Sequence, residues 1–99
     1  MHHDFTAHEV SEIELARELC SGMLVDGQPV ICFDILYEVI QGTKRMDDLP
    51  SQLLVTVYSQ LKDYNRFWQE APWYDNTALE AVLPKLRLLV HSELTRRRS

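Results

Sequence analysis

The sequence predicts an all-α fold: a single helical domain over residues 1–99, built as a compact bundle of about four helices. Apolar residues recur at intervals of three and four in successive stretches of the chain, which is the spacing of one face of an α-helix. Of the 99 residues, 45% are hydrophobic and 25% charged, as expected for a globular domain. We expect an up-and-down arrangement, with a smaller core completed by a partner chain as the alternative.

The first helix is expected from about Ala7 to Ser21. Thr6 and Glu9 have the spacing of a capping box, in which each side chain bonds the other residue's backbone amide, and Gly22 can end the helix in a left-handed conformation. The core-facing positions are Val10, Ile13, Ala16, Leu19, Cys20 and Met23. The opposite side carries the acidic residues Glu9, Glu12, Glu14 and Glu18. The helix is therefore amphipathic with an acidic outer surface, and residues 1–5 before it are expected to be frayed.

The segment around Asp26-Gly27 has two interpretations. This dipeptide favours a tight turn, which would join residues 23–25 and 30–33 in a short β-hairpin. Pro29, however, lacks the backbone donor that a second strand needs. In a helix that begins close to Pro29 the missing donor costs nothing, and Gly42 is positioned to end that helix. We favour this helix, apolar over most of its circumference and therefore central, and keep the hairpin as the alternative. Its apolar positions include Phe33, Leu36, Tyr37 and Ile40.

A third helix is predicted to follow the polar connector at residues 43–47. Asp47 or Asp48 is positioned to cap it, with Pro50 in its first turn. Its regular apolar seam consists of Leu54, Val57, Leu61, Tyr64 and Trp68. The helix should end before Pro72, since the residue that precedes a proline disfavours the helical conformation.

The last helix is expected to begin at a second capping-box match, Thr77 with Glu80. Its apolar positions are Leu79, Val82, Leu83, Leu86, Leu89, Val90 and Leu94. Pro84 lies inside this pattern and predicts a kink or a later start. Residues 96–99 are expected to be frayed, with three arginines that offset the helix dipole.

No motif in the sequence indicates catalysis, so we expect no enzymatic activity, no cofactor and no metal site. The chain has no HExxH, no glycine-rich phosphate loop and no GxSxG. With the N-terminal amine and the next two amides, a histidine at the third position such as His3 can chelate copper or nickel. A disordered start of the chain is the better interpretation of these residues. We interpret Cys20 and Cys32 as reduced, partly buried thiols of a cytoplasmic protein. No apolar run reaches the roughly 20 residues that span a membrane.

The charge of the chain is distributed unevenly. Residues 1–50 hold ten acidic and three basic residues, a net charge of −7, whereas residues 51–99 hold five acidic and seven basic residues, a net charge of +2. The total of −5 argues against nucleic-acid binding, because such domains usually present a basic face. The asymmetry can steer a partner or pair two copies head to tail. An inhibitor of the phage or antitoxin type, whose acidic surface mimics nucleic-acid phosphates, is an alternative function.

The best candidates for a binding site are aromatic residues between the last two helices. Phe67 lies one position off the seam, and Trp73 and Tyr74 follow Pro72 in a loop. Large aromatics in a loop either fold back onto the bundle or are buried in a partner. We predict a non-catalytic protein-interaction module, an adaptor, chaperone or regulator, that binds through these aromatics and guides its partner with carboxylates. The predicted partner-binding residues are Phe67, Trp73, Tyr74, Glu12, Glu14 and Glu18.

Two further expectations concern what the chain binds. The apolar positions exceed what four short helices can cover, so a homodimer is expected. A small-ligand binder or an enzyme with a pocket between the second and third helices is the remaining alternative. Such a pocket would be lined by Tyr37, Tyr58 or Tyr64.

Overall fold

The computed structural model of the chain describes residues 5–25, 27–63 and 77–98. Within these ranges the chain forms four α-helices, a short 3-10 helix and a two-stranded antiparallel hairpin. In chain order they are α1 (Ala7–Leu19), β1 (Leu24–Val25), β2 (Gln28–Pro29), α2 (Cys32–Gln41), η1 (Met46–Asp48), α3 (Ser51–Lys62) and α5 (Thr77–Arg98). The prediction of a small all-α bundle is confirmed.

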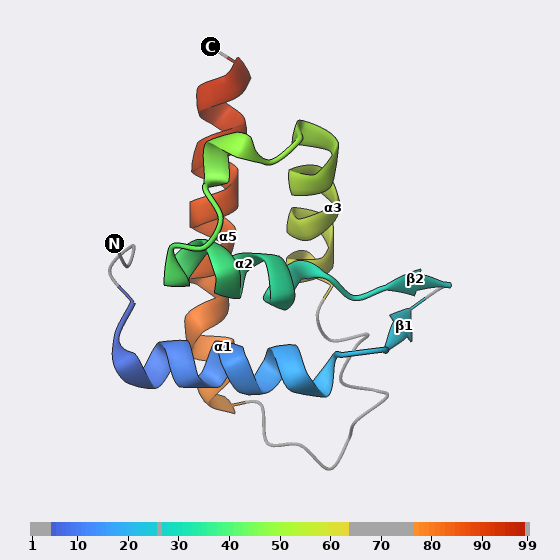
Figure 1. Cartoon of the computed structure of the whole chain (residues 1–99), viewed down its shortest axis with the longest axis vertical. Coiled ribbons are helices and arrows are strands. Elements are labelled where there is room, and N and C mark those ends of the chain that lie inside the picture. The colour runs from blue at the N-terminus through green and yellow to red at the C-terminus, as the bar shows by residue number, and fades with distance from the viewer. Residues whose placement is uncertain (1–4, 26, 64–76, 99) are drawn as a thin grey trace.

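The helices pack as two antiparallel pairs (Figure 1). α1 and α2 run side by side in opposite directions, with the hairpin between them, and α3 and α5 form the second pair. The first pair lies across the second, so the arrangement differs from the up-and-down bundle expected from the sequence. α5 contacts both α1 and α3, and α2 contacts α3, which joins the two pairs into one core.

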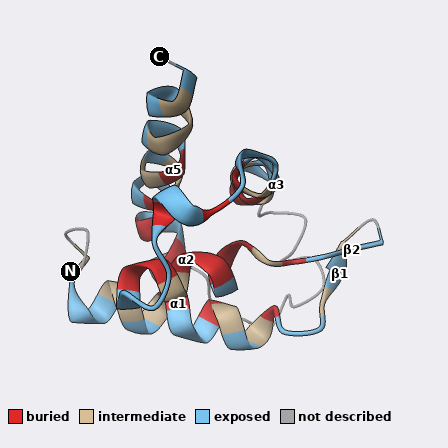
Figure 2. Ribbon diagram, turned by 45° about the horizontal axis from the view of Figure 1, so that its top comes forward, coloured by how far each residue is buried: buried red, intermediate tan, exposed pale blue. Residues whose placement is uncertain are grey.

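The core is centred on α2. This helix buries six of its ten residues, and Figure 2 shows most of its ribbon in the colour of buried residues. The predicted central helix is therefore confirmed. The largest fully buried side chains are Phe33, Ile13, Leu36, Ile40, Leu54, Leu61, Leu79, Leu83, Leu86, Val57 and Val90. Removal of this apolar surface from water is the main favourable term in folding.

α1 begins at the predicted capping box. Thr6 Oγ1 accepts a hydrogen bond from Glu9 N at 3.1 Å, and Glu9 Oε1 accepts one from Thr6 N at 2.9 Å. Two amide groups at the helix start are thereby satisfied. The helix ends at Leu19 with Cys20 as its C-cap, slightly earlier than predicted. Gly22 follows in the turn with a left-handed φ of 79°.

The hairpin and the helix proposed for residues 23–41 both form, one after the other. In the hairpin Leu24 lies opposite Pro29. The missing donor of Pro29 is tolerated because the next residue, Val30, makes the cross-strand bond, donating its N–H to Met23 O at 3.1 Å. The favoured interpretation, in which the helix begins close to Pro29, is therefore wrong about the first residue of the helix, because α2 begins at Cys32.

The first turn of α2 is capped by a residue from α3. Its own N-cap, Ile31, makes no side-chain cap bond. Instead, Gln60 Oε1 accepts hydrogen bonds from Ile31 N at 2.9 Å and from Cys32 N at 3.1 Å. Gln60 Nε2 donates to Pro29 O at 2.9 Å. One side chain thus fixes β2 and the start of α2 against α3, and Gly42 ends α2 as predicted, with φ of 89°.

The start of α3 differs from the prediction. Residues 46–48 form the separate turn η1, so neither Asp47 nor Asp48 caps the helix. Pro50 takes the N-cap position with an extended backbone. A proline there is compatible with helix initiation because its φ is already fixed and the first amides of a helix need no intrahelical acceptor.

The seam of α3 is confirmed over its described length. Leu54, Val57 and Leu61 are fully buried. The helix ends at Lys62, with Asp63 as its C-cap, and does not continue unbroken toward Pro72. The basic residue of its last turn, Lys62, is favourable at the negative end of the helix dipole. The remaining seam residues, Tyr64 and Trp68, lie outside the described residues.

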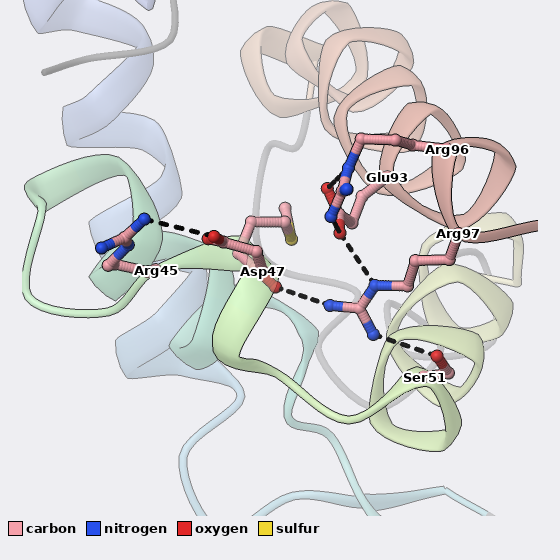
Figure 3. Close-up of polar contacts among 7 residues, drawn as sticks. Arg45, Asp47, Ser51, Glu93, Arg96 and Arg97 are labelled. Carbon is pink, nitrogen blue, oxygen red and sulfur yellow. Dashed lines mark hydrogen bonds and ion pairs between the residues drawn. The ribbon is translucent and has the colours of Figure 1, made fainter.

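α5 is one helix from Thr77 to Arg98 and includes Pro84, so the later start does not occur. Its last turn is anchored, where the sequence suggested a frayed end. Arg97 Nε donates to Glu93 Oε2 at 2.8 Å, Arg97 Nη1 to Ser51 Oγ at 3.0 Å and Arg97 Nη2 to Met46 O at 3.0 Å (Figure 3). This guanidinium ties the end of α5 to η1 and to the start of α3.

Candidate functional site

The described residues bury most of their large apolar side chains, so the exceptions mark a candidate surface. Four remain exposed: Leu15, Leu24, Val55 and Leu88. Val55 on α3 is 49% exposed and Leu88 on α5 is 64% exposed, and the two helices pack against each other. We define the α3–α5 face by the residues around them: Val55, Tyr58, Lys62, Pro84, Arg87, Leu88 and His91.

Two shallow hollows on the α3–α5 face meet at Tyr58. The first, of about 300 Å³, is lined by Tyr58, Pro84, Arg87, Leu88 and His91. The second, of about 210 Å³, is lined by Val55, Tyr58, Ser59, Lys62 and Asp63. Each is at or below the roughly 300–1,000 Å³ that is usual for a small-molecule site. Two adjoining hollows of this size suit the side chains of a protein partner.

Tyr58 is held between two side chains at the centre of this face. Lys62 Nζ lies 5.6 Å from the centre of the Tyr58 ring, within the range of a cation–π interaction. The His91 ring lies on the adjoining helix, with its centre 5.8 Å from that of Tyr58. An aromatic side chain that is already positioned loses little conformational freedom when a partner binds.

The charged groups of the α3–α5 face are mainly basic. Lys62 and Arg87 are cationic, His91 adds a third positive charge when protonated, and Asp63 lies at the edge of the second hollow. Arg87 Nε is buried, and no described group accepts its hydrogen bond. Buried donors normally have an acceptor, so Arg87 adds to this face a cation with one unsatisfied donor.

The predicted acidic residues lie together on α1. Glu14 and Glu18 are exposed and Glu12 is half-buried. Glu14 Oε2 accepts a hydrogen bond from Tyr37 Oη at 2.7 Å, which raises the pKa of Tyr37. Within the described residues, none of the three carboxylates has a basic partner. We define the α1 face as these three glutamates and Leu15, which is 41% exposed.

Other carboxylates of the acidic first half form ion pairs with basic side chains of the same copy. The ion pairs are Lys85–Glu9 at 2.8 Å, Arg17–Asp34 at 2.7 Å and Lys44–Glu38 at 3.1 Å. The hydrogen bond from Lys85, followed by the backbone bond from Thr6, holds the pKa of Glu9 below its usual value. These pairs weaken the negative field available to mimic nucleic-acid phosphates and leave the α1 face as its main source.

The aromatic part of the predicted site cannot be placed. Phe67, Trp73 and Tyr74 lie outside the described residues, and their role in partner binding stays a prediction. Of the predicted tyrosine pocket, Tyr37 bonds to Glu14 on α1 and Tyr58 lines the two hollows of the α3–α5 face, and the pocket itself stays a prediction. The third tyrosine of that prediction, Tyr64, also lies outside the described residues.

A larger hollow of about 440 Å³ lies where the end of α2 meets α5. It is lined by Val39, Gly42, Lys44, Arg45, Met46, Asp47 and Glu93. Its polar side chains already have partners, and one of the pairs is Lys44 with Glu38. Figure 3 shows two others, Arg45 with Asp47 and Glu93 with two arginines. A ligand here would have to displace these contacts, so this hollow is the weaker candidate.

The described residues offer no assembled site for metal or thiol chemistry. No three His, Cys, Asp or Glu side chains among them gather closely enough to hold a metal ion. Cys20 and Cys32 are free and buried, and burial raises the pKa of both thiols, that of Cys20 to about 11. Both are therefore neutral at pH 7 and poor nucleophiles. No helix in the described ranges combines the length and apolar character that a membrane crossing requires.

Sequence reasoning missed the α3–α5 face, although a signal for it exists. Val55 directly follows the seam residue Leu54, and Leu88 lies between two positions of the apolar stripe of α5. An apolar residue that falls outside the core-facing stripe of its helix is a candidate for a second contact surface. What the sequence does not reveal is that these two positions meet around Tyr58.

Comparison of the chain with protein-family models, curated proteins and solved structures finds no match.

Proposed function

We propose that this chain is a non-catalytic protein-interaction module, an adaptor, chaperone or regulator, whose α3–α5 face binds a protein partner. The observation that carries the proposal is the pair of exposed side chains Val55 and Leu88 on either side of Tyr58. Binding energy in protein interfaces is concentrated in a few aromatic and arginine residues near the centre. Tyr58 and Arg87 are such residues.

The charges around the α3–α5 face favour an acidic partner. Lys62 and Arg87 flank the apolar positions, so carboxylates on the partner would meet them as its apolar side chains enter the hollows. Charges of this kind mainly accelerate association and select the partner, whereas the apolar anchors slow dissociation. The free, buried thiols Cys20 and Cys32 suit a reducing compartment, and we place the protein in the cytoplasm.

Site-specific photo-crosslinking in cells tests this proposal. A benzoylphenylalanine at Val55 should give a discrete protein adduct, and the same residue at the exposed position Gln41, at the end of α2, should not. The adduct at Val55 should disappear when Leu88→Asp is added, because an aspartate introduces a desolvated charge into the interface. Equal adducts at both positions, or an adduct that survives Leu88→Asp, would show that this face is not the binding surface.

A further inference from the structure

We infer that the partner of the α3–α5 face is the α1 face of a second copy of this chain. The inference rests on the proposed function and names the occupant of that surface. It deepens the general expectation of a dimer by assigning the two different surfaces that meet.

The α1 face presents one apolar side chain with carboxylates around it. Leu15 is exposed and lies three residues after Glu12 and three before Glu18. Side chains three residues apart are neighbours on a helix surface. Glu14 adds a third carboxylate, held in place by the hydroxyl of Tyr37.

The α3–α5 face presents the complementary arrangement. Its hollows offer an apolar surface between Val55 and Leu88 with the Tyr58 ring at the centre, which suits an isolated leucine. Lys62 and Arg87 flank this surface and would meet the carboxylates on either side of that leucine. The apolar centre and the charged surroundings therefore match in both chemistry and order, as in a specific interface.

A single copy does not satisfy these charges. The ion pairs of the described residues occur within each half of the chain, except Lys85–Glu9 between α5 and α1, and none joins the α1 face to the α3–α5 face. The two halves carry net charges of −7 and +2. Two copies approaching with opposite halves together gain favourable electrostatic steering, which two like halves would not.

Contact between two different surfaces makes a specific prediction for mixtures. In a heterologous interface one copy supplies the α1 face and the other supplies the α3–α5 face. A variant damaged on one face retains the other. Two variants damaged on different faces should therefore fail to self-associate but should bind each other.

The test uses the purified full chain and sedimentation velocity. The first variant combines Leu15→Arg with Glu18→Lys, and the second combines Leu88→Asp with Lys62→Glu. All four side chains are exposed, so the fold should persist, which circular dichroism would verify. The matched control is Leu24→Asp, because Leu24 is about as exposed as Leu88 but lies on the hairpin, outside both faces.

We expect the wild type and the Leu24→Asp control to associate with increasing concentration. Each face variant alone should associate at least about tenfold more weakly, and their equimolar mixture should restore a 1:1 complex. High salt should weaken association of the wild type, since the screening length falls to about 3 Å at 1 M ionic strength.

Three outcomes would overturn the inference. They are a wild type that stays monomeric at high concentration, a mixture of the two variants that does not associate, and an equal loss of association in the Leu24→Asp control. If one of these occurs while the Val55 crosslink to another protein persists, the partner is a different protein and the proposed function stands. If the crosslink is also absent, both fail.

Discussion

Replacing Gln60 with alanine removes the side chain that fixes the start of α2. Gln60 lies on α3 and is half-buried. Its carbonyl oxygen accepts from Ile31 N and Cys32 N, and its amide donates to Pro29 O. Alanine leaves α3 intact, because it is the best helix former, so the effect should report the lost cap rather than a damaged helix.

The expected loss of stability is about 2 kcal/mol. Three hydrogen bonds at a net value of roughly 1 kcal/mol each give about 3 kcal/mol. Water can replace part of the bond to Pro29, which is exposed, and alanine gains a few tenths of a kcal/mol in helix propensity. The result lies at the upper end of the roughly 0.5–2 kcal/mol measured for loss of an N-cap.

Urea unfolding followed by circular dichroism measures this loss. With a slope of about 1.5 kcal/mol per molar urea, the midpoint should fall by about 1.3 M. The matched control is Gln52→Ala, the same substitution at an exposed position of the same helix, which should change stability by less than about 0.5 kcal/mol. Amide hydrogen exchange should become faster at Ile31 and Cys32, since both amides lose their acceptor.

Equal midpoints for Gln60→Ala and Gln52→Ala would refute this reasoning. So would unchanged exchange rates at Ile31 and Cys32, because the cap would then contribute nothing to the stability of the first turn of α2. A loss of stability without faster exchange at these amides would indicate that Gln60 acts through general packing instead.

Three further predictions concern the anchored end of α5 and the buried thiols. Arg97→Ala should lower the free energy of unfolding by about 1–2 kcal/mol. Arg96→Ala, at a side chain that is 62% exposed, should change it much less, because exposed ion pairs contribute little. Equal effects of the two substitutions in thermal unfolding would contradict the anchoring role of Arg97. Hydrogen bonds from Arg96 and Arg97 hold the pKa of Glu93 below its usual 4.5, so the stability that ionised Glu93 contributes is present above pH 4.5 and is lost as pH falls through the lower folded pKa. The difference in unfolding free energy between wild type and Glu93→Gln should therefore shrink toward low pH. A difference that grows toward low pH would contradict the lowered pKa. Burial raises the pKa of Cys20 to about 11 and also raises that of Cys32, so both thiols should resist alkylation at pH 8 until the chain unfolds. Rapid alkylation of the native protein would contradict their burial.

The helices could be predicted because their signals are local. The capping box at Thr6, the left-handed glycine Gly42 and the seam from Leu54 to Leu61 each depend on residues within one or two turns. The short hairpin also has a local signal in its turn. The structure confirms these features, each of which depends on residues close together in the sequence.

The features that could not be predicted depend on contacts between distant segments. Gln60 caps a helix that begins 28 residues earlier in the chain, and Arg97 bonds to Ser51 across 46 residues. A single glutamine or arginine at an exposed-looking position carries no signal for such a partner. For the same reason, the crossing of the two helix pairs could not be inferred from connector lengths alone.

The candidate site was only partly accessible from the sequence. The acidic α1 face has a local signal, because Glu14 and Glu18 lie four residues apart and Glu12 and Glu18 each lie three residues from Leu15. The α3–α5 face does not, because Val55 and Leu88 become one surface only when α3 and α5 pack together. The predicted aromatic site at residues 67–74 lies outside the described residues and stays a prediction.

A carbodiimide crosslink between copies tests directly whether the α1 face of one copy binds the α3–α5 face of another. This reagent joins a lysine to a carboxylate in direct contact, and the intramolecular pair Lys85–Glu9 at 2.8 Å provides an internal positive control. In a mixture of ¹⁴N-labelled and ¹⁵N-labelled protein, we predict a mixed-isotope crosslink from Lys62 to Glu18 or Glu12. Recovery of the Lys85–Glu9 crosslink without any mixed-isotope crosslink to Lys62 would contradict the claim that the α1 face of one copy binds the α3–α5 face of another.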